Sequence, residues 1–228
     1  MAENLENLTS IRKDSVKLSD VKVSKSDITF KYHTLNGRKP KACKDYVGIW
    51  NSSGGMIPVN QKSRDSDEIK NDDSSGTWTI VDANISSDEY ILGYCLTGNP
   101  AENEKAYKNV SASAIIPRED GLVGNVINCM DLHIEGNSSS ATLTYTILAG
   151  MERNEHWLGI WRNGPFINPS DKAEFVQKIT DGDSKNVGRI VFNNIGLRRN
   201  NIYTLAYFAN GWDNKDISNM VAYIHFQI

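Results

Sequence analysis

Lys44-Asp45-Tyr46-Val47-Gly48-Ile49-Trp50-Asn51 returns later in the chain as Glu155-His156-Trp157-Leu158-Gly159-Ile160-Trp161-Arg162. The offset is 111 residues, from Lys44 to Glu155, and both stretches read aromatic-aliphatic-Gly-Ile-Trp. Apolar residues on both faces of so short a stretch are typical of a central strand that is covered on both sides. The sequence therefore predicts one buried strand that occurs twice.

Four further blocks repeat in the same order, at offsets between 110 and 113 residues. The matched blocks are 20–23 with 131–134, 80–85 with 190–195, 90–94 with 203–207, and 109–112 with 219–222. Self-similarity at one period is the signature of a structural unit that the chain contains more than once. The repeat therefore predicts two copies of one domain, with small insertions and deletions in the loops.

The blocks read as strands. Apolar and polar residues alternate at Ile28, Phe30 and Tyr32, and turn-forming residues separate such segments. About seven short strands in roughly 100 residues predict an all-β fold of two tandem Ig-like or fibronectin-like antiparallel β-sandwiches. The expected domains are an N-terminal tail at 1–19, sandwich 1 at 20–117, a linker at 118–126 and sandwich 2 at 127–228.

The repeated strand resembles a known pattern. Asp45-Tyr46-Val47-Gly48-Ile49-Trp50 is similar to a strand of SKICH domains and of the amino-terminal Ig-like domain of plant purple acid phosphatases. In that pattern an aromatic-x-aliphatic-x-Tyr strand follows, here 90–94 and 203–207, whereas His156 replaces the leading Asp in the second repeat. The resemblance implies an Ig-like fold. It also implies a non-enzymatic protein, since SKICH domains act in protein interaction and the phosphatase module accompanies a separate catalytic domain.

Charge and hydropathy exclude several classes of partner. The formal net charge of −3 provides no basic field to attract nucleic acid. No apolar run is long enough to span a bilayer. The N-terminal residues include acidic groups where a signal peptide needs basic ones. We therefore expect no nucleic-acid partner, no membrane span and a cytoplasmic chain as synthesised, with export by a non-classical route as the alternative.

The three cysteines, Cys43, Cys95 and Cys129, do not form a disulfide framework, because their count is odd and small. A bridge between the sheets would recur in both repeats, yet the position equivalent to Cys95 is Phe208. All three are predicted to be free thiols.

No catalytic or metal-binding motif is recognisable. The stretch from Asp181 begins like a calcium loop, but its sixth position is not Gly and its twelfth is Phe192 instead of Glu. No Gly-x-Ser-x-Gly elbow is present, and the four histidines have no ligand spacing. We therefore predict no enzymatic activity, no metal site and no cofactor. The basic run 38–44 is predicted to be a solvated loop, because the second repeat lacks it.

One loop differs between the repeats in an informative way. Trp212, Asp213 and Asn214 lie in a turn-rich segment before the last strand, and the first repeat has Asn99 or Pro100 in place of the tryptophan. Loop aromatics at the end of a sandwich are typical contact residues for a protein or a sugar. The three residues are the candidate partner-binding site. The alternative is that Trp212 covers the core or fills the junction between the domains.

These observations favour a non-enzymatic recognition protein that acts through protein–protein interaction or self-association of its tandem Ig-like domains. The main alternative is a lectin-like protein that binds a carbohydrate, or a protein associated with an adhesin or toxin. A second alternative is a self-assembling structural protein.

Overall fold

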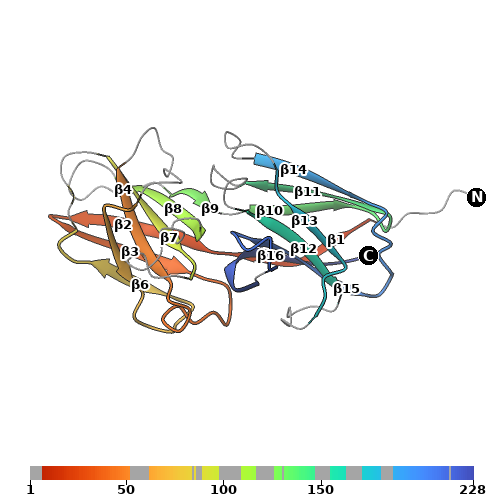
Figure 1. Cartoon of the computed structure of the whole chain (residues 1–228), viewed down its shortest axis with the longest axis horizontal. Coiled ribbons are helices and arrows are strands. Elements are labelled where there is room, and N and C mark those ends of the chain that lie inside the picture. Colours follow the sequence, from red (N-terminus) through yellow and green to blue (C-terminus); the bar gives the residue numbers. More distant parts are fainter. Residues whose placement is uncertain are drawn as a thin grey trace, which may run out of the picture. The chain divides into compact units, whose positions relative to one another are not determined.

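A computed structural model describes residues 7–51, 62–83, 85, 89–97, 109–116, 126–129, 131–146, 155–162, 171–180, 187–215 and 217–228. Strands make up almost all of the regular secondary structure in these ranges, and they contain no α-helix. The predicted all-β fold is confirmed (Figure 1).

The chain forms two compact units, which we name after the repeats that build them. The first-repeat unit comprises Ser15–Met130 together with Ile147–Gly150. The second-repeat unit comprises Asp131–Thr146 and Met151–Ile228 and, from the start of the sequence, Met1–Asp14.

The first-repeat unit contains two antiparallel sheets, with strand orders β5-β4-β7-β8-β9 and β2-β3-β6. The strands are β2 Lys17–Ser24, β3 Asp27–His33, β4 Tyr46–Asn51, β5 Asp65–Glu68, β6 Ser75–Ile80, β7 Tyr90–Cys95, β8 Val110–Ile116 and β9 Val126–Cys129. Tyr32 of β3 stacks on Tyr94 of β7 with ring centroids 5.9 Å apart, so the two sheets share a core.

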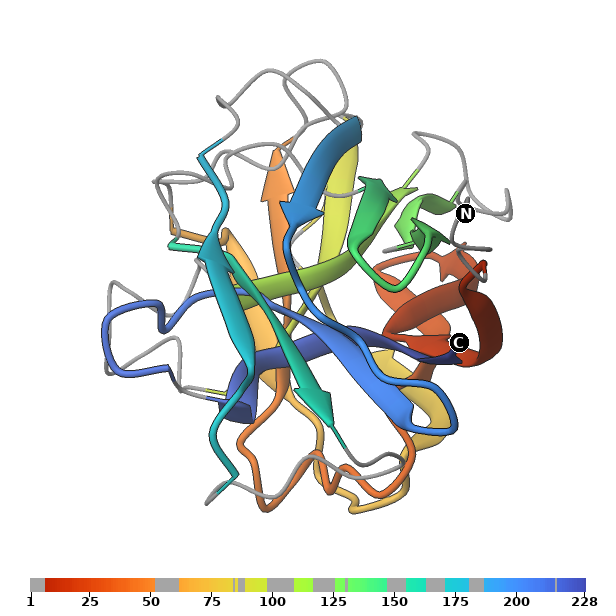
Figure 2. The same cartoon turned by 90° about the vertical axis from the view of Figure 1, so that its right-hand side faces the viewer.

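The second-repeat unit has the same arrangement, with strand orders β13-β12-β15-β16-β1 and β10-β11-β14 (Figure 2, green to blue ribbons, with β1 in red). The strands are β1 Thr9–Ser15, β10 Asp131–Gly136, β11 Ser140–Thr146, β12 Trp157–Arg162, β13 Phe175–Lys178, β14 Val187–Asn193, β15 Ile202–Phe208 and β16 Met220–Gln227. Tyr145 of β11 and Tyr207 of β15 repeat the tyrosine contact, again with centroids 5.9 Å apart. The predicted internal repeat is therefore a repeat of structure.

The five-stranded sheets bury apolar side chains on both faces, as the repeated motif predicts. Because Tyr94 faces the other sheet, its neighbours along β7 alternate, and Ile91 points to the opposite, outer face. Trp50 lies opposite Ile91, and Trp161 lies opposite Thr204, the equivalent position. Both indoles are nevertheless buried. Trp50 and Trp161 thus occupy equivalent positions, as expected.

The unit boundaries differ from the expected domain boundaries at both joins. The expected tail, 1–19, contains β1 and the start of β2, and β1 lies beside β16 in the second-repeat unit. The expected linker, 118–126, lies outside the described residues except for Val126, which begins β9 and pairs with β8 of the first-repeat unit. The alternation of apolar residues did not reveal β1 because its sequence, TSIRKDS, contains a single apolar side chain.

Candidate interaction surfaces

The glycine of each Gly-Ile-Trp motif makes room for the tryptophan two residues later. A Cβ atom added to Gly48 would lie 2.5 Å from Cη2 of Trp50, and one added to Gly159 would collide with the same atom of Trp161. Each indole therefore lies back over its own strand, where only a residue without a side chain fits. The repeated motif serves the fold and does not mark a ligand site.

An aromatic cluster covers the outer face of the five-stranded sheet in the second-repeat unit. Trp157 stacks on Phe208 with centroids 4.0 Å apart and an interplanar angle of 12°, and Trp161 packs against the edge of the same ring. The indole N–H of Trp157 donates to the carbonyl of Asn210, at 3.1 Å. The loop that begins at Asn210 is thereby held against this cluster.

Trp212 lies in that loop and is partly buried against the aromatic cluster. The Lys215 ammonium lies 3.4 Å from the centroid of the indole ring and also donates to the Trp212 carbonyl. Asp213 and Asn214 are exposed. The three predicted site residues therefore lie in different environments. Trp212 packs against the aromatic cluster and makes a cation–π contact with Lys215, whereas Asp213 and Asn214 face solvent.

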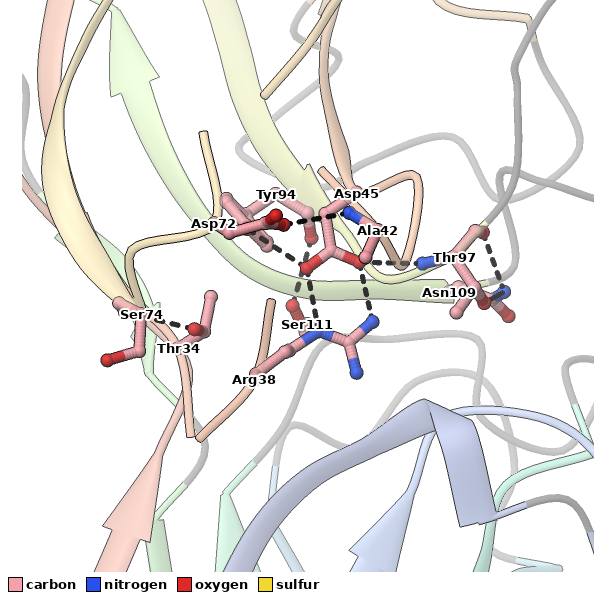
Figure 3. Close-up of polar contacts among 10 residues, drawn as sticks. All are labelled: Thr34, Arg38, Ala42, Asp45, Asp72, Ser74, Tyr94, Thr97, Asn109 and Ser111. Carbon is pink, nitrogen blue, oxygen red and sulfur yellow. Dashed lines mark hydrogen bonds and ion pairs between the residues drawn. The ribbon is translucent and has the colours of Figure 1, made fainter. Parts of the chain in front are cut away.

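A buried ion pair organises the loop before β4 (Figure 3). Arg38 donates from Nε and Nη2 to the two carboxylate oxygens of Asp45, at 2.6 and 2.5 Å. The Asp45 side chain is fully buried and that of Arg38 is 9% exposed. Arg38 belongs to the basic run 38–44, so the prediction of a wholly solvated loop is wrong at this residue, because its charge is neutralised by Asp45.

Asp45 is fully hydrogen-bonded. Besides Arg38, the Tyr94 hydroxyl donates to Oδ2 at 3.1 Å and the Thr97 N–H donates to Oδ1 at 3.0 Å. Two donors on each oxygen use the acceptor positions of a carboxylate. Burial, with the Asp45 charge as the next cause, raises the pKa of Tyr94. A saturated carboxylate and a phenol that stays protonated indicate a structural network, not acid–base chemistry.

The described residues show neither a metal-binding cluster nor a membrane-crossing helix. They include no group of three or more His, Cys, Asp or Glu side chains arranged to hold a metal ion. The stretch 181–186, which begins like a calcium loop, lies outside them. A membrane-crossing helix is not found in the part of the chain that the structure describes.

Two of the cysteines have described side chains. Cys43 and Cys95 are free, as predicted. Burial raises the pKa of the Cys95 thiol to about 12, so this thiol remains protonated and unreactive in the folded unit. The side chain of Cys129 lies outside the described residues.

The clearest difference between the repeats lies at equivalent sheet edges. β5 pairs with β4, and β13 pairs with β12, in the same register. β5 reads Asp-Ser-Asp-Glu, whereas β13 reads Phe-Val-Gln-Lys and exposes 43% of Val176. Charged side chains on an edge strand oppose pairing with other chains, and apolar ones permit it. Within the described residues, the β5 edge has this acidic protection and the β13 edge lacks it.

Sequence reasoning missed the β13 edge, although a signal was present. Both strands are only four residues long, and neither shows a clear alternation. Aligning the repeats at an offset of 110 places Asp65 on Phe175 and Asp67 on Gln177. That loss of acidic residues is the signal, but it has meaning only when both strands are known to be edges.

Comparisons with known proteins identify no family for this chain. No protein-family model matches the chain, and no curated protein matches it significantly. Among solved structures, the FN1–FN3 domains of chicken CNTN1 are similar over 88% of this chain and 61% of that one, with 14% identity and a TM-score of 0.24. This chain thus spans less than two thirds of that structure.

These comparisons give no support to the finer resemblance to SKICH domains or purple acid phosphatases.

Proposed function

We propose that the chain is a non-enzymatic recognition protein that binds an extended segment of another polypeptide along the β13 edge. The observation that carries the proposal is the contrast between β5 and β13, two strands at the same place in two copies of one fold. An unprotected edge presents a row of main-chain donors and acceptors, and strand addition to such an edge is an established mode of peptide binding. The exposed Val176 side chain would add an apolar contact.

The lectin-like alternative ranks second. It depends on Trp212, with Asp213 and Asn214 as polar neighbours. A sugar stacks on a free face of an aromatic ring, and the Lys215 ammonium covers one face of this indole. Glycan binding at this loop therefore requires the lysine to move first.

Photo-crosslinking at the two equivalent edges tests the proposal. A photoreactive amino acid is placed at Val176 in one variant and at Ser66 in the matched control, since Val176 lies opposite Gly159 and Ser66 lies opposite Gly48. Each variant is irradiated in extract of the cells that make the protein. We expect crosslinks to polypeptide from position 176 and few or none from position 66. Equal yields from both positions would contradict the proposal.

A graft of the protected edge supplies the second half of the test. Phe175→Asp, Gln177→Asp and Lys178→Glu give β13 the acidic side chains of β5. The crosslinks from position 176 should then disappear while circular dichroism and the unfolding midpoint of the second-repeat unit, which contains β13, stay the same. Crosslinks that persist through the graft would show that main-chain pairing at this edge is not the mode of binding.

A further inference from the structure

Each five-stranded sheet obtains its fifth strand from the start of the other repeat. β1 precedes β2, the first matched strand of repeat one, but lies beside β16 in the second-repeat unit. β9 precedes β10, the first matched strand of repeat two, but lies beside β8 in the first-repeat unit. β1 and β9 therefore hold the same position in their sheets, and the two repeats have exchanged their leading strands.

β1 is attached mainly through its main chain. Of its seven side chains only Ser15, at the end next to β2, is buried, and Ile11, the single apolar one, is 50% exposed. The Leu8 N–H donates to the Gly136 carbonyl at 3.0 Å. Lys13 pairs with Asp131 at 2.7 Å, but both side chains are more than half exposed. Such exposed pairs add little stability.

The sheet that β1 covers is well formed without it. β16 is eight residues long, pairs with β15 along its length, and buries five of its side chains. Removing β1 would leave a long edge of ordered main-chain groups, which is a template for another strand. A strand that buries few side chains, on a sheet that is stable by itself, detaches at a low free energy of local opening.

The connection to β1 is short. β1 ends at Ser15 and β2 begins at Lys17, so Val16 alone links a strand of one unit to a strand of the other. Val16 is fully buried. Short hinges between exchanged elements favour exchange between copies of a chain, since the strand makes the same contacts in both arrangements.

From these observations we infer that β1 of one copy pairs with β16 of a second copy, so that the chain assembles with itself by strand exchange. The partner is a second copy of this chain, because its β1 makes every contact that the chain's own β1 makes, including those with Gly136 and Asp131. Reciprocal exchange gives a closed dimer, and successive exchange gives a linear assembly. This inference involves β1 and β16 and does not rest on the β13 edge.

A disulfide trap tests the exchange. Asn7 and Asn137 form an antiparallel bridge within the second-repeat unit. Directly paired antiparallel residues have Cα atoms roughly 4.5–5.5 Å apart, within the range that a disulfide spans. In a Cys43→Ser/Cys129→Ser background, the Asn7→Cys and Asn137→Cys variants are unfolded together, refolded at about 1 mM and oxidised. Tethers of this length give effective concentrations on the order of millimolar.

We expect a disulfide-linked dimer between the two variants, containing on the order of a tenth of the protein or more. Each single variant alone serves as the control for nonspecific crosslinking. The Asn7→Cys/Asn137→Cys double variant, oxidised when dilute, should form the intrachain disulfide and then remain monomeric at 1 mM. Efficient formation of the intrachain disulfide with no mixed dimer would overturn strand exchange, as would failure of the intrachain disulfide to form in the folded double variant.

Discussion

Asp45 accepts a hydrogen bond from the Tyr94 hydroxyl at 3.1 Å, and the second repeat keeps this contact with different chemistry. There the equivalent residues are His156 and Tyr207, with Nδ1 and the hydroxyl oxygen 2.7 Å apart. The fold thus requires a polar partner for the buried tyrosine but not a carboxylate. In the first repeat the buried Arg38 guanidinium also pairs with this carboxylate, so there the charge of Asp45 has a partner.

Asp45→Asn should strongly destabilise the first-repeat unit. The substitution keeps the shape of the side chain but leaves the Arg38 guanidinium, 9% exposed, without a counter-charge. Breaking a buried ion pair by removing one partner costs about 3–5 kcal/mol. Urea unfolding monitored by circular dichroism measures the change. Asp20→Asn is the matched control, because Asp20 pairs with Lys31 on the surface, and it should leave the unfolding midpoint unchanged.

Gly48→Ala should lower the stability of the first-repeat unit by about 1–3 kcal/mol, the usual cost of overpacking a core. The added Cβ would lie 2.5 Å from the ring of Trp50, which is buried and has no space to move into. The cost should be smaller when measured in a Trp50→Phe background, where the ring is shorter. Additive effects of the two substitutions would show that Gly48 and Trp50 do not interact in this way.

Stability of the second-repeat unit should depend on His225 at acidic pH. Burial lowers the pKa of His225 from its ordinary value near 6.5, and the Arg12 charge on β1 lowers it further. The unfolded chain therefore binds the proton more readily than the folded unit. The folded unit therefore keeps its full stability above pH 6.5, where His225 is neutral in both states. It loses stability as the pH falls from 6.5 toward the lowered pKa of the folded unit.

Urea unfolding of the wild type and of His225→Gln at pH 7.5 and pH 5 measures this dependence. The wild type should lose more stability on acidification than the variant, since the two proteins differ only at residue 225. An equal loss in the two proteins would exclude a contribution from His225. Glutamine is chosen because it preserves a hydrogen-bonding partner for Thr204, whose Oγ1 lies 2.9 Å from Nδ1 of His225.

Alanine substitutions in the loop 212–214 should separate support of the core from contact with a partner. Trp212→Ala should destabilise the second-repeat unit by about 1–3 kcal/mol, less than the cost of deleting a fully buried indole. Asp213→Ala and Asn214→Ala should change stability by less than about 0.5 kcal/mol, because both residues are exposed. Thermal unfolding measures all three. A neutral Trp212→Ala would favour the contact role instead.

The sequence was sufficient to predict the repeat, the all-β fold and the equivalence of Trp50 and Trp161, because these depend on hydrophobic pattern and period. It was insufficient for β1, whose side chains are exposed and whose strand is specified by the main-chain groups of β16. Which sheet a polar strand joins is a tertiary property that no local pattern records.

The environments of Arg38 and Trp212 are also tertiary properties that the local sequence does not record. The absence of the basic run 38–44 from the second repeat predicts a solvated loop, but the Arg38 guanidinium pairs with the buried Asp45 carboxylate. Trp212 has no tryptophan counterpart in the sequence of the first repeat, and its packing against the cluster of Trp157 and Phe208 depends on how the loop folds back over the sheet. Comparing the sequences of the two repeats identifies residues that occur in one repeat alone. The three-dimensional structure is needed to show whether such a residue lies in the core or on the surface.

Hydrogen exchange after removal of residues 2–14 is the most direct test of the exchanged leading strands. If β1 completes the sheet of the second repeat, amide protection should fall along β16, Met220–Gln227, because its outer main-chain groups lose their partners. Protection along β8, Val110–Ile116, should stay as in the intact chain, since β9 still pairs with it. Loss of protection along β8 with β16 unchanged would contradict the account.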